Sequence, residues 1–275
     1  MTVVVIGPVT RDLIINGNTR ESKIGGASYF QSYVFEKYCP DYICIINCAD
    51  YDALSEFPDS AKVRVLEKDD THYYINRYLS PDLRIQSSNF ADIPISVSDL
   101  EDILADIEEI DAFVLNPLNS FDFPLETVEY LKSFDADIYI SLQGFLRQAL
   151  EKTDEDAYSI DLKLTQDAVS KISDIDGLFL DEAEASILFK DNSYNDFNIS
   201  QIVITNASKG SRIIADRQYK IDAVKCDNIA DSTGCGDTFM AAYISKKLKG
   251  ESITDSANFA SKIASDKLKY FGPIK

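Results

Sequence analysis

The chain has 275 residues, of which 46 are acidic and 27 basic, giving a formal net charge of −19. This charge opposes any broad attraction to nucleic acid or to an anionic bilayer, although backbone amides at a helix N-terminus can still bind an anionic cofactor. With 45% hydrophobic and 27% charged residues, the composition is that of an ordinary globular protein, and the length suits one large α/β domain better than two equal ones.

The first segment, Met1–Gly7, enters a strand pattern directly and lacks the basic flank and cleavage site of a signal peptide. No apolar stretch approaches the roughly 20 residues that are needed to cross a bilayer. The five cysteines are scattered without a Cys-x-x-Cys pair, which argues against a disulfide framework and favours reduced thiols. We therefore expect a cytoplasmic protein.

Short β-branched segments alternate with helix-like segments along the chain. Their hydrophobicity is nearly continuous, which is typical of strands that are covered on both faces, as in a parallel sheet. The predicted strands are Val3–Ile6, Tyr42–Ile46, Ala112–Leu115, Asp137–Ser141, Gly177–Leu180 and Ile202–Thr205. This pattern predicts an α/β fold with a doubly wound, mostly parallel sheet flanked by helices.

Two stretches, Leu13–Lys23 and Lys62–Asn89, interrupt this alternation and lack a helical period. Antiparallel strands that leave the main sheet would explain them, and such an excursion can cover a cleft as a lid. We therefore predict a single domain over residues 1–275, with a small β-strand lid contributed by about residues 13–23 and 62–89.

The clearest helix is predicted over Ser98–Ile110, where Ser98 and Glu101 form a plausible capping box. Apolar residues recur there at helical spacing. The many carboxylates of this segment are interpreted as a solvated face rather than as a metal site.

The strongest local signal is the run Asp231–Phe239, Asp-Ser-Thr-Gly-Cys-Gly-Asp-Thr-Phe, which leads into a helix predicted over Thr238–Leu248. Gly234 and Gly236 permit close approach of a ligand to the backbone, and the helix start aims free amides at it. Asp237 would lie beside a bound anion, where it could accept a hydroxyl proton during phosphoryl transfer. On these residues alone, a capping role for Asp237 is an equally good interpretation.

The whole nonapeptide resembles the C-terminal signature of the ribokinase-like, or PfkB, carbohydrate kinase family, whose usual form is Asp-Thr-x-Gly-Ala-Gly-Asp-x-Phe. The resemblance implies that Asp237 is the catalytic base. It also implies that the backbone around Gly234, Cys235 and Gly236 stabilises charge on the transferred group.

Features near the N-terminus agree with this resemblance. Gly25 and Gly26, followed by a helix-like segment, are similar to the double-glycine signature of the family near the phosphate acceptor, and Asp12 matches its early Asp that binds substrate hydroxyls. Gln143 and Arg147 follow a predicted strand, where doubly wound folds bind ligands, so both are candidate substrate-binding residues. A turn Gln and a solvated Arg are equally good interpretations of this pair.

The second half of the chain resembles the donor site of the family. Asp181 and Glu184 stand in a run similar to its Asn-x-x-Glu element, whose Glu helps to order hydrated Mg²⁺, although plain helix surface is the other interpretation. Thr205 and Gly210 bound a segment in the place of its nucleotide loop, and Asn258 matches the late helix beside the adenine. The resemblance implies ATP and Mg²⁺ as cofactors and leaves a requirement for a monovalent cation open.

The sequence departs from the family pattern at four positions. Tyr29 and Asp181 each replace Asn, Cys235 replaces Ala or Ser, and Ala207 replaces the first loop glycine. A carboxylate at Asp181 would repel phosphates unless Mg²⁺ or a basic group intervenes.

Together these features predict an ATP-dependent kinase that phosphorylates a hydroxyl of a small polyol, a sugar or a cyclitol. The runs Gly25–Phe30, Thr71–Tyr78 and Gln143–Arg147 resemble the inositol-kinase-like archaeal and plant branch, which makes inositol the first choice. A nucleoside kinase is one alternative, and a non-catalytic sugar-binding regulator with the same fold is another. We expect no nucleic-acid or membrane partner, and the lid is the candidate surface for a homodimer.

Overall fold

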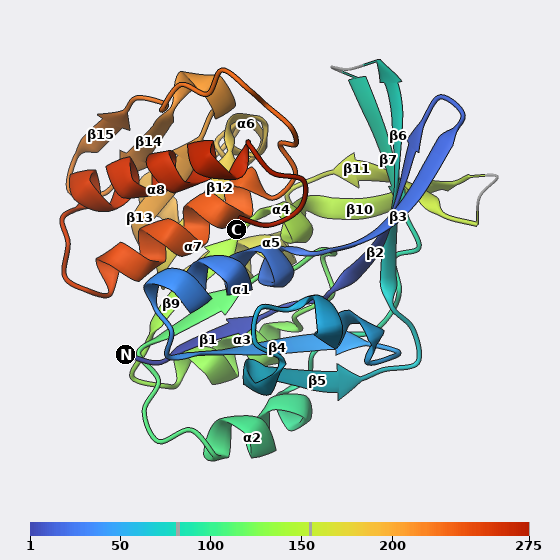
Figure 1. The fold of residues 1–275 in the computed structure, drawn as a ribbon. Coiled ribbons are helices and arrows are strands. Elements are labelled where there is room, and N and C mark those ends of the chain that lie inside the picture. The colour runs from blue at the N-terminus through green and yellow to red at the C-terminus, as the bar shows by residue number, and fades with distance from the viewer. Residues whose placement is uncertain (81–82, 154–155, 275) are drawn as a thin grey trace.

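The computed structural model describes residues 1–80, 83–153 and 156–274. Over these residues the larger of two sheets has nine strands in the order β15-β14-β13-β12-β9-β8-β1-β4-β5 (Figure 1). In chain order they are β1 (Val3–Ile6), β4 (Tyr42–Cys48), β5 (Val63–Glu67), β8 (Ala112–Leu115), β9 (Asp137–Ser141), β12 (Ile175–Asp181), β13 (Ile199–Thr205), β14 (Ser211–Ile214) and β15 (Gln218–Ile221).

The neighbouring strands from β13 to β5 are all parallel. At the edge, β14 is antiparallel to both of its neighbours, β13 and β15. All four residues of β1 are buried, as are all four of β8. Such continuous burial requires cover on both faces of the sheet, so the predicted doubly wound α/β fold is confirmed.

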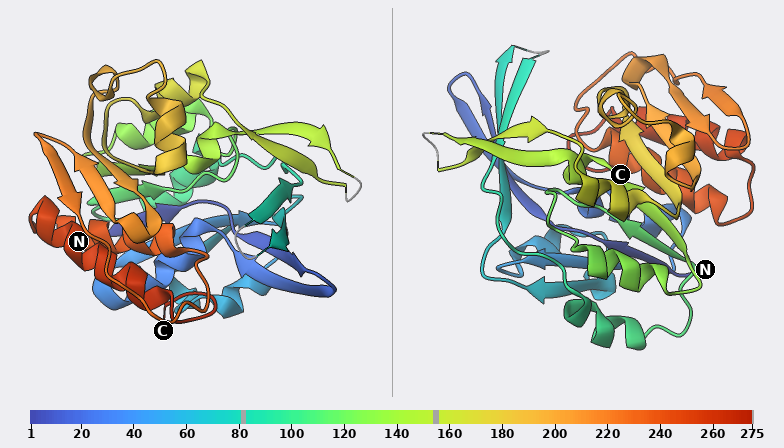
Figure 2. Two further views of the ribbon diagram at one scale, coloured as in Figure 1. Left: turned by 90° about the horizontal axis from the view of Figure 1, so that it is seen from above. Right: turned by 180° about the vertical axis from the view of Figure 1, so that it is seen from behind.

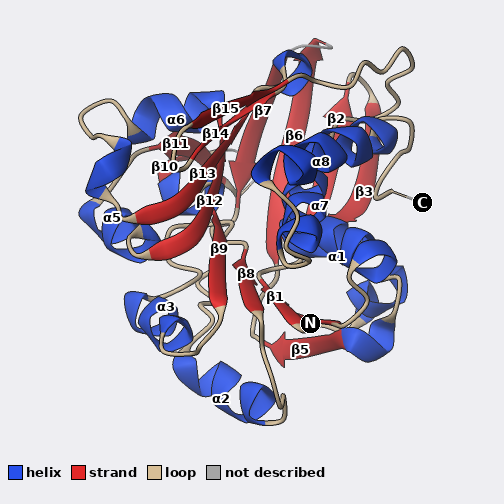
Figure 3. Ribbon diagram, turned by 90° about the vertical axis from the view of Figure 1, so that its left-hand side faces the viewer, coloured by secondary structure: helices blue, strands red, loops and turns tan. Residues whose placement is uncertain are grey.

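Helices supply this cover (Figure 3). One face carries α1 (Ala27–Tyr38), α7 (Cys235–Lys247) and α8 (Ile253–Lys267), and the other carries α2 (Val97–Ala105), α3 (Leu125–Lys132), α5 (Gln166–Ile172) and α6 (Glu182–Leu188). A short helix α4 (Gln143–Leu146) and the 3₁₀ turns Asp52–Glu56, Ser60–Lys62, Tyr194–Asp196 and Ala207–Lys209 complete the helical elements of the described residues. Within them, no helix combines the length and apolar character needed to cross a membrane.

The second sheet, called the lid sheet below, extends away from the main sheet (Figure 2). Its strand order is β10-β11-β7-β6-β2-β3. The strands are β2 (Thr10–Asn16), β3 (Thr19–Gly25), β6 (His72–Ser80), β7 (Leu83–Ser88), β10 (Arg147–Lys152) and β11 (Tyr158–Leu162).

The lid sheet differs from the prediction in three ways. The predicted span 62–89 includes β5, which belongs to the main sheet, and the hairpin of β10 and β11 was not predicted. The neighbouring strands β2 and β6 are parallel, whereas antiparallel strands were expected. Residues 81–82 of the predicted lid, and residue 275 of the predicted domain, lie outside the described residues.

The predicted helix Ser98–Ile110 is shorter and begins earlier. Its N-cap is Ser96, which forms a capping box with Asp99, so the predicted box of Ser98 and Glu101 is wrong. The Asp99 carboxylate is also 2.8 Å from Lys68, which ties the helix start to the end of β5. The helix ends at Ala105, five residues before the predicted end at Ile110, and the residues that follow lead into β8.

Candidate active site

The carboxyl ends of the parallel strands, the base of the lid sheet and the N-terminus of α7 contribute the predicted site residues (Figure 1). The loop Asp231–Gly236, called the anion loop after its predicted role, leads into α7. Gly234 takes a left-handed φ of 75° and is the N-cap of the helix. A Cβ at this position would lie 2.3 Å from the Phe30 ring, so both conformation and space require glycine.

The first turn of α7 keeps free backbone donors. No side chain caps this helix, and the Cys235 amide donates to the Ser232 carbonyl oxygen at 3.2 Å. Within the described residues, the amides of Gly236 and Asp237 have no acceptor, as expected for a helix start without a cap. A Cβ at Gly236 would meet no atom within 4 Å, so the space on that side of Gly236 is open. Two free amides and a helix dipole suit an anion.

Asp237 lies beside these amides. Since the N-cap is Gly234 and no side chain caps the helix, the capping interpretation of Asp237 is wrong. Burial raises the pKa of the Asp237 carboxyl to about 6, against the opposing charges of Arg147 and Lys267. A carboxylate with this pKa is ionised at neutral pH and is more basic than an ordinary Asp, which suits a general base.

Arg147 joins the lid sheet to the site. Its side chain is only 6% exposed, so the solvated interpretation is wrong. Its guanidinium donates to the Tyr74 hydroxyl at 2.9 Å and to Gln86 Oε1 at 3.1 Å, and it lies 4.8 Å from the centroid of the Tyr74 ring. The charge of Arg147 lowers the pKa of both Asp237 and Glu184, so it reaches both ends of the candidate site.

Three predicted substrate-binding residues meet at the base of the lid sheet. Asp12 on β2 accepts a hydrogen bond from Thr10 Oγ1 at 2.7 Å and faces the same side of the sheet as Tyr74, its partner on β6. A Cβ at Gly25 would lie 2.7 Å from Asp12 Oδ2, so the absence of a side chain there makes room for the carboxylate. Gly26 is the N-cap of α1, with a φ of 99°.

The start of α6 is closed by its own side chains. Asp181 Oδ1 accepts a hydrogen bond from the Glu184 amide at 2.8 Å, and Glu184 Oε2 accepts one from the Asp181 amide at 2.8 Å. Burial, and secondly the Asp181 carboxylate, raise the pKa of Glu184 to about 7, while Arg147 and a hydrogen bond with Gln143 lower it. Gln143, Arg147, Glu184 and Asp181 therefore lie together.

The fit of this group to Mg²⁺ depends on the mode of binding. Among the described residues, no three His, Cys, Asp or Glu side chains are arranged to hold a metal ion directly. Glu184 is buried and Asp181 beside it is exposed. Burial is the first cause of the raised pKa of Glu184, and the negative charge of Asp181 is the second. A hydrated Mg²⁺ keeps several waters and needs only one or two carboxylates plus phosphate oxygens, so these residues fit an ion that is bound through water.

The predicted nucleotide loop is a tight turn after β13. Thr205 ends this strand, and the Asn206 amide donates to the Gly210 carbonyl at 2.8 Å. Gly210 has a φ of 91°, and Ala207 takes a φ of 44°, a left-handed value that glycine adopts without strain. Asn258 is exposed on α8.

The two remaining departures from the family pattern do not obstruct the site. Tyr29 is buried and its ring lies 5.4, 5.7 and 5.5 Å from those of Phe30, Tyr33 and Phe57. The thiol of Cys235 is 3.8 Å from the Ala264 carbonyl oxygen of α8, and burial raises its pKa to about 11. Both side chains thus pack against other parts of the chain.

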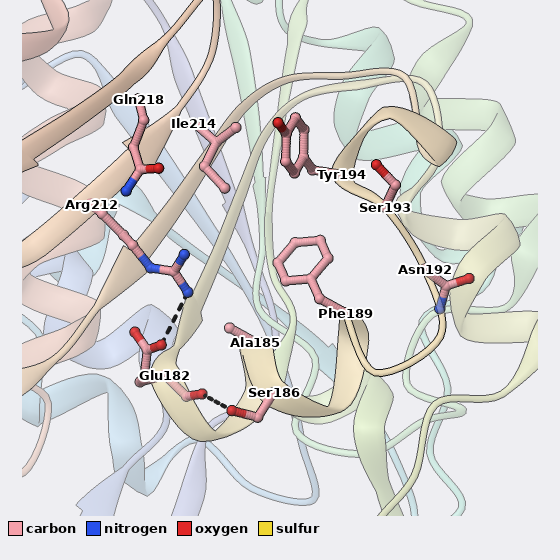
Figure 4. Close-up of a pocket in the computed structure, with 10 residues that line it drawn as sticks. All are labelled: Glu182, Ala185, Ser186, Phe189, Asn192, Ser193, Tyr194, Arg212, Ile214 and Gln218. Carbon is pink, nitrogen blue, oxygen red and sulfur yellow. Dashed lines mark hydrogen bonds and ion pairs between the residues drawn. The ribbon is translucent and has the colours of Figure 1, made fainter.

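A hollow of about 410 Å³ lies elsewhere, between α6 and the edge strands β14 and β15 (Figure 4). Arg212 and Glu182 form an ion pair at 3.0 Å across one side of it, with Phe189, Tyr194 and Ile214 nearby. None of the predicted site residues lines it. The site is therefore defined by the residues around α7 and not by this hollow.

Sequence reasoning missed four residues of the site region. Tyr74 and Gln86 hold Arg147 from the lid sheet, and Phe30 lies under Gly234. Lys267, at the end of α8, is completely buried against the anion loop. The alternation of β6 could have placed Tyr74 on the inner face of the lid, but nothing in the local sequence indicated the position of Lys267.

Comparison with known proteins identifies the class. Residues 142–275 match the model of the pfkB family carbohydrate kinases. A search of curated proteins finds no match. A pyrophosphate-dependent kinase of the ribokinase family, solved with a pyrophosphate analog and myo-inositol, is 23% identical with a TM-score of 0.80, over 99% of this chain and 97% of that chain.

Two further solved structures are more distant. Arabidopsis thaliana ribokinase complexed with ribose and ATP is 17% identical, with a TM-score of 0.73 over 98% of this chain and 93% of that chain. Burkholderia thailandensis nucleoside kinase in complex with inosine is 15% identical, with a TM-score of 0.75 over 98% of this chain and 92% of that chain. The chain thus has the fold of ribokinase-family kinases, and the resemblance to the PfkB family is confirmed.

Proposed function

We propose that this protein transfers a phosphoryl group from ATP to a hydroxyl of a small polyol, a sugar or a cyclitol such as inositol. The observation that carries the proposal is the position of Asp237, a carboxylate with a raised pKa next to two unpaired amides of an uncapped helix start. This combination places a base beside an anion-binding backbone, which is what in-line transfer to an alcohol requires.

In the proposed reaction the acceptor hydroxyl gives its proton to Asp237 while its oxygen attacks the terminal phosphorus of the donor. The bond from that phosphorus to its bridging oxygen breaks, and the rest of the donor leaves as ADP, or as phosphate when pyrophosphate is the donor. The amides of Gly236 and Asp237 stabilise the negative charge of the phosphoryl group in the transition state, and Arg147 adds a positive charge from the lid side. Asp12 binds vicinal hydroxyls of the acceptor. Mg²⁺, when bound, neutralises phosphate charge, and Glu184 is the residue proposed to hold it through water.

A polyol acceptor is favoured by the polar inner face of the lid sheet. Gln86 donates to Asn76 Oδ1 at 3.0 Å, and both lie on the face that carries Asp12 and Tyr74. A ring of hydroxyls matches such a surface better than an apolar substrate does. A relative with the same fold binds myo-inositol, which supports the same substrate class here.

ATP is the proposed donor because the segments that contain Thr205, Gly210 and Asn258 resemble in sequence the nucleotide-binding elements of the family. Pyrophosphate is the second candidate, since a structure that matches over nearly the whole chain is a pyrophosphate-dependent kinase. The free amides and Arg147 bind phosphate groups and do not distinguish the two donors.

A reducing, cytoplasmic location belongs to the same proposal. The five cysteines are free, and Cys39, Cys44 and Cys48 are buried. A homodimer through the lid sheet stays a prediction that the molecular mass in solution would test.

The proposal is tested by incubating the protein with Mg²⁺ and either ATP or pyrophosphate, together with inositols, pentoses, hexoses or nucleosides. Phosphorylated product is followed by ³¹P NMR, with the Asp237→Asn variant as control. We expect a phosphorylated polyol with ATP. If product forms with pyrophosphate but not with ATP, pyrophosphate is the donor. If product forms only with nucleosides, the acceptor is a nucleoside and not a polyol. Sugar binding without product would favour a non-catalytic regulator.

A further inference from the structure

Lys267 is a buried cation at the back of the candidate site. It is the last residue of α8, and its side chain is 0% exposed. A buried ammonium group is costly unless it is paired. Within the described residues its hydrogen-bond acceptor is the Asp231 carbonyl at 2.9 Å, its ion-pair partner is Asp231 Oδ2 at 3.5 Å, and the Phe30 ring centroid lies 5.8 Å from its Nζ. These contacts lie in or beneath the anion loop.

Asp231 also forms hydrogen bonds within the loop and with the segment that follows α8. Its Oδ1 accepts a hydrogen bond from the Thr233 amide at 2.9 Å, and its Oδ2 accepts one from the Gly272 amide at 3.3 Å. The preceding Ala230 amide donates to the Leu268 carbonyl at 2.7 Å. The beginning of the anion loop is therefore fastened to the end of α8, and the ammonium group of Lys267 neutralises the carboxylate at the centre of this arrangement.

The charge of Lys267 also acts on the reacting groups. Against the effect of burial, hydrogen bonds with Thr233 lower the pKa of Asp231, and the charge of Lys267 lowers it further. Burial raises the pKa of Cys235 and of Asp237, and the charge of Lys267 opposes both rises. Arg147 is the other cation that acts on Asp237, and it comes from the lid side. A fixed positive charge in a water-poor region interacts strongly with a phosphate group nearby and needs no reorganisation when the charge of that group changes.

We propose that Lys267 is a positioning residue for phosphoryl transfer: a built-in cation that holds the anion loop through Asp231 and gives the loop positive charge. Because this ammonium group is a fixed cation beside the anion loop, we infer that transfer needs no added monovalent cation. This inference rests on the proposed function and goes beyond it in naming a residue outside the nonapeptide.

The first test is Lys267→Met, which keeps most of the side-chain volume and removes the charge. The matched control is Lys171→Met, because Lys171 is also buried, donates to the Ser120 carbonyl oxygen at 2.9 Å and lies 5.2 Å from the Phe145 ring centroid. We expect Lys267→Met to lower kcat by about 10- to 100-fold, less than the direct loss of an oxyanion donor, and to move the acid limb of the pH–rate profile to higher pH. Lys171→Met should keep the wild-type kcat and the wild-type position of the acid limb.

The second test is chemical rescue. In Lys267→Ala, methylammonium or ammonium ions should restore part of kcat relative to sodium ions at equal ionic strength, because they can refill the place of the missing group. The wild-type protein should respond equally to all three salts. Calorimetry with pyrophosphate should give a weaker affinity for Lys267→Met than for Lys171→Met.

Unchanged kcat and an unchanged acid limb in Lys267→Met would overturn the inference. So would a loss of kcat with no shift of the limb and no rescue by amines, since that is the signature of a merely structural residue. If Lys267→Met does not fold, Lys267→Gln keeps a donor for the Asp231 carbonyl and should still shift the limb. An inactive wild type would reject the proposed function instead, and the pyrophosphate affinities would then decide about Lys267.

Discussion

The N-termini of α6 and α7 both carry acidic residues in their first turn, but they differ in how their backbone amides are satisfied. At α6, Asp181 and Glu184 exchange hydrogen bonds with each other's amides. At α7, Gly234 is the N-cap and no side chain closes the end. The amides at the start of α6 are thus bonded by its own side chains, whereas two amides at the start of α7 stay free, and this contrast is the observation that favours α7 as the proposed anion site.

The largest expected effect comes from removing the base at the open end. Asp237→Asn should lower kcat by about 10²- to 10⁴-fold, the range for loss of a general base, while leaving donor affinity unchanged. Asp255 is the matched control because it stands in the first turn of α8. Asp255→Asn should keep wild-type kcat, and steady-state kinetics with calorimetry of donor binding compares the two. A near-normal kcat in Asp237→Asn would mean that another group takes the proton.

The next effect is a loss of stability at Gly234, the N-cap of α7. Gly234→Ala should lower the free energy of unfolding by about 1–2 kcal/mol for the left-handed conformation alone, and further because its Cβ meets Phe30. Gly250 is a suitable control, since it has a φ of 78° and open space around its Cβ position. Denaturant titration should show a larger loss for Gly234→Ala than for Gly250→Ala, and only the former should weaken donor binding. Equal losses would show that the contact with Phe30 is unimportant.

The smallest effect is expected at the closed end. Asp181→Ala removes an N-cap and should cost about 1 kcal/mol of stability, whereas Asp181→Asn keeps a capping oxygen and should cost less. Asp181→Asn also removes the second cause of the raised pKa of Glu184, so that pKa should fall. Because Asp181→Asn removes a negative charge near the proposed place of the donor phosphates, the KM of this variant for the donor should decrease. An increased KM would show that the Asp181 carboxylate helps to hold the donor, through Mg²⁺ or otherwise.

The sequence predicted the main sheet well because its strands are buried on both faces. Val3–Ile6, Ala112–Leu115 and Asp137–Ser141 are confirmed to the residue. The hairpin of β10 and β11 was missed because most of β10 is exposed and polar, so no hydrophobic alternation marked it. Its register depends on partners far away in the chain, which local patterns do not contain.

The candidate site was predicted only in part, because local patterns do not contain contacts between distant parts of the chain. The glycines and Asp237 follow one another in the chain, so a local motif could indicate the uncapped helix start. Arg147 and Lys267 reach Asp237 from the lid base and from the end of α8, and only the tertiary fold brings these charges together. A lysine at a helix C-terminus is also what the helix dipole favours, so no local pattern indicated that Lys267 is buried.

The most direct test of the account is the pH dependence of single-turnover phosphoryl transfer in the wild type and in Asp237→Asn. Because the base must be ionised and burial raises its pKa to about 6, the wild-type rate should be constant near neutral pH and fall as the pH drops below about 6. Asp237→Asn should show a low rate without this limb. A variant that keeps the same acid limb at a near-normal rate would contradict the assignment of Asp237 as the base.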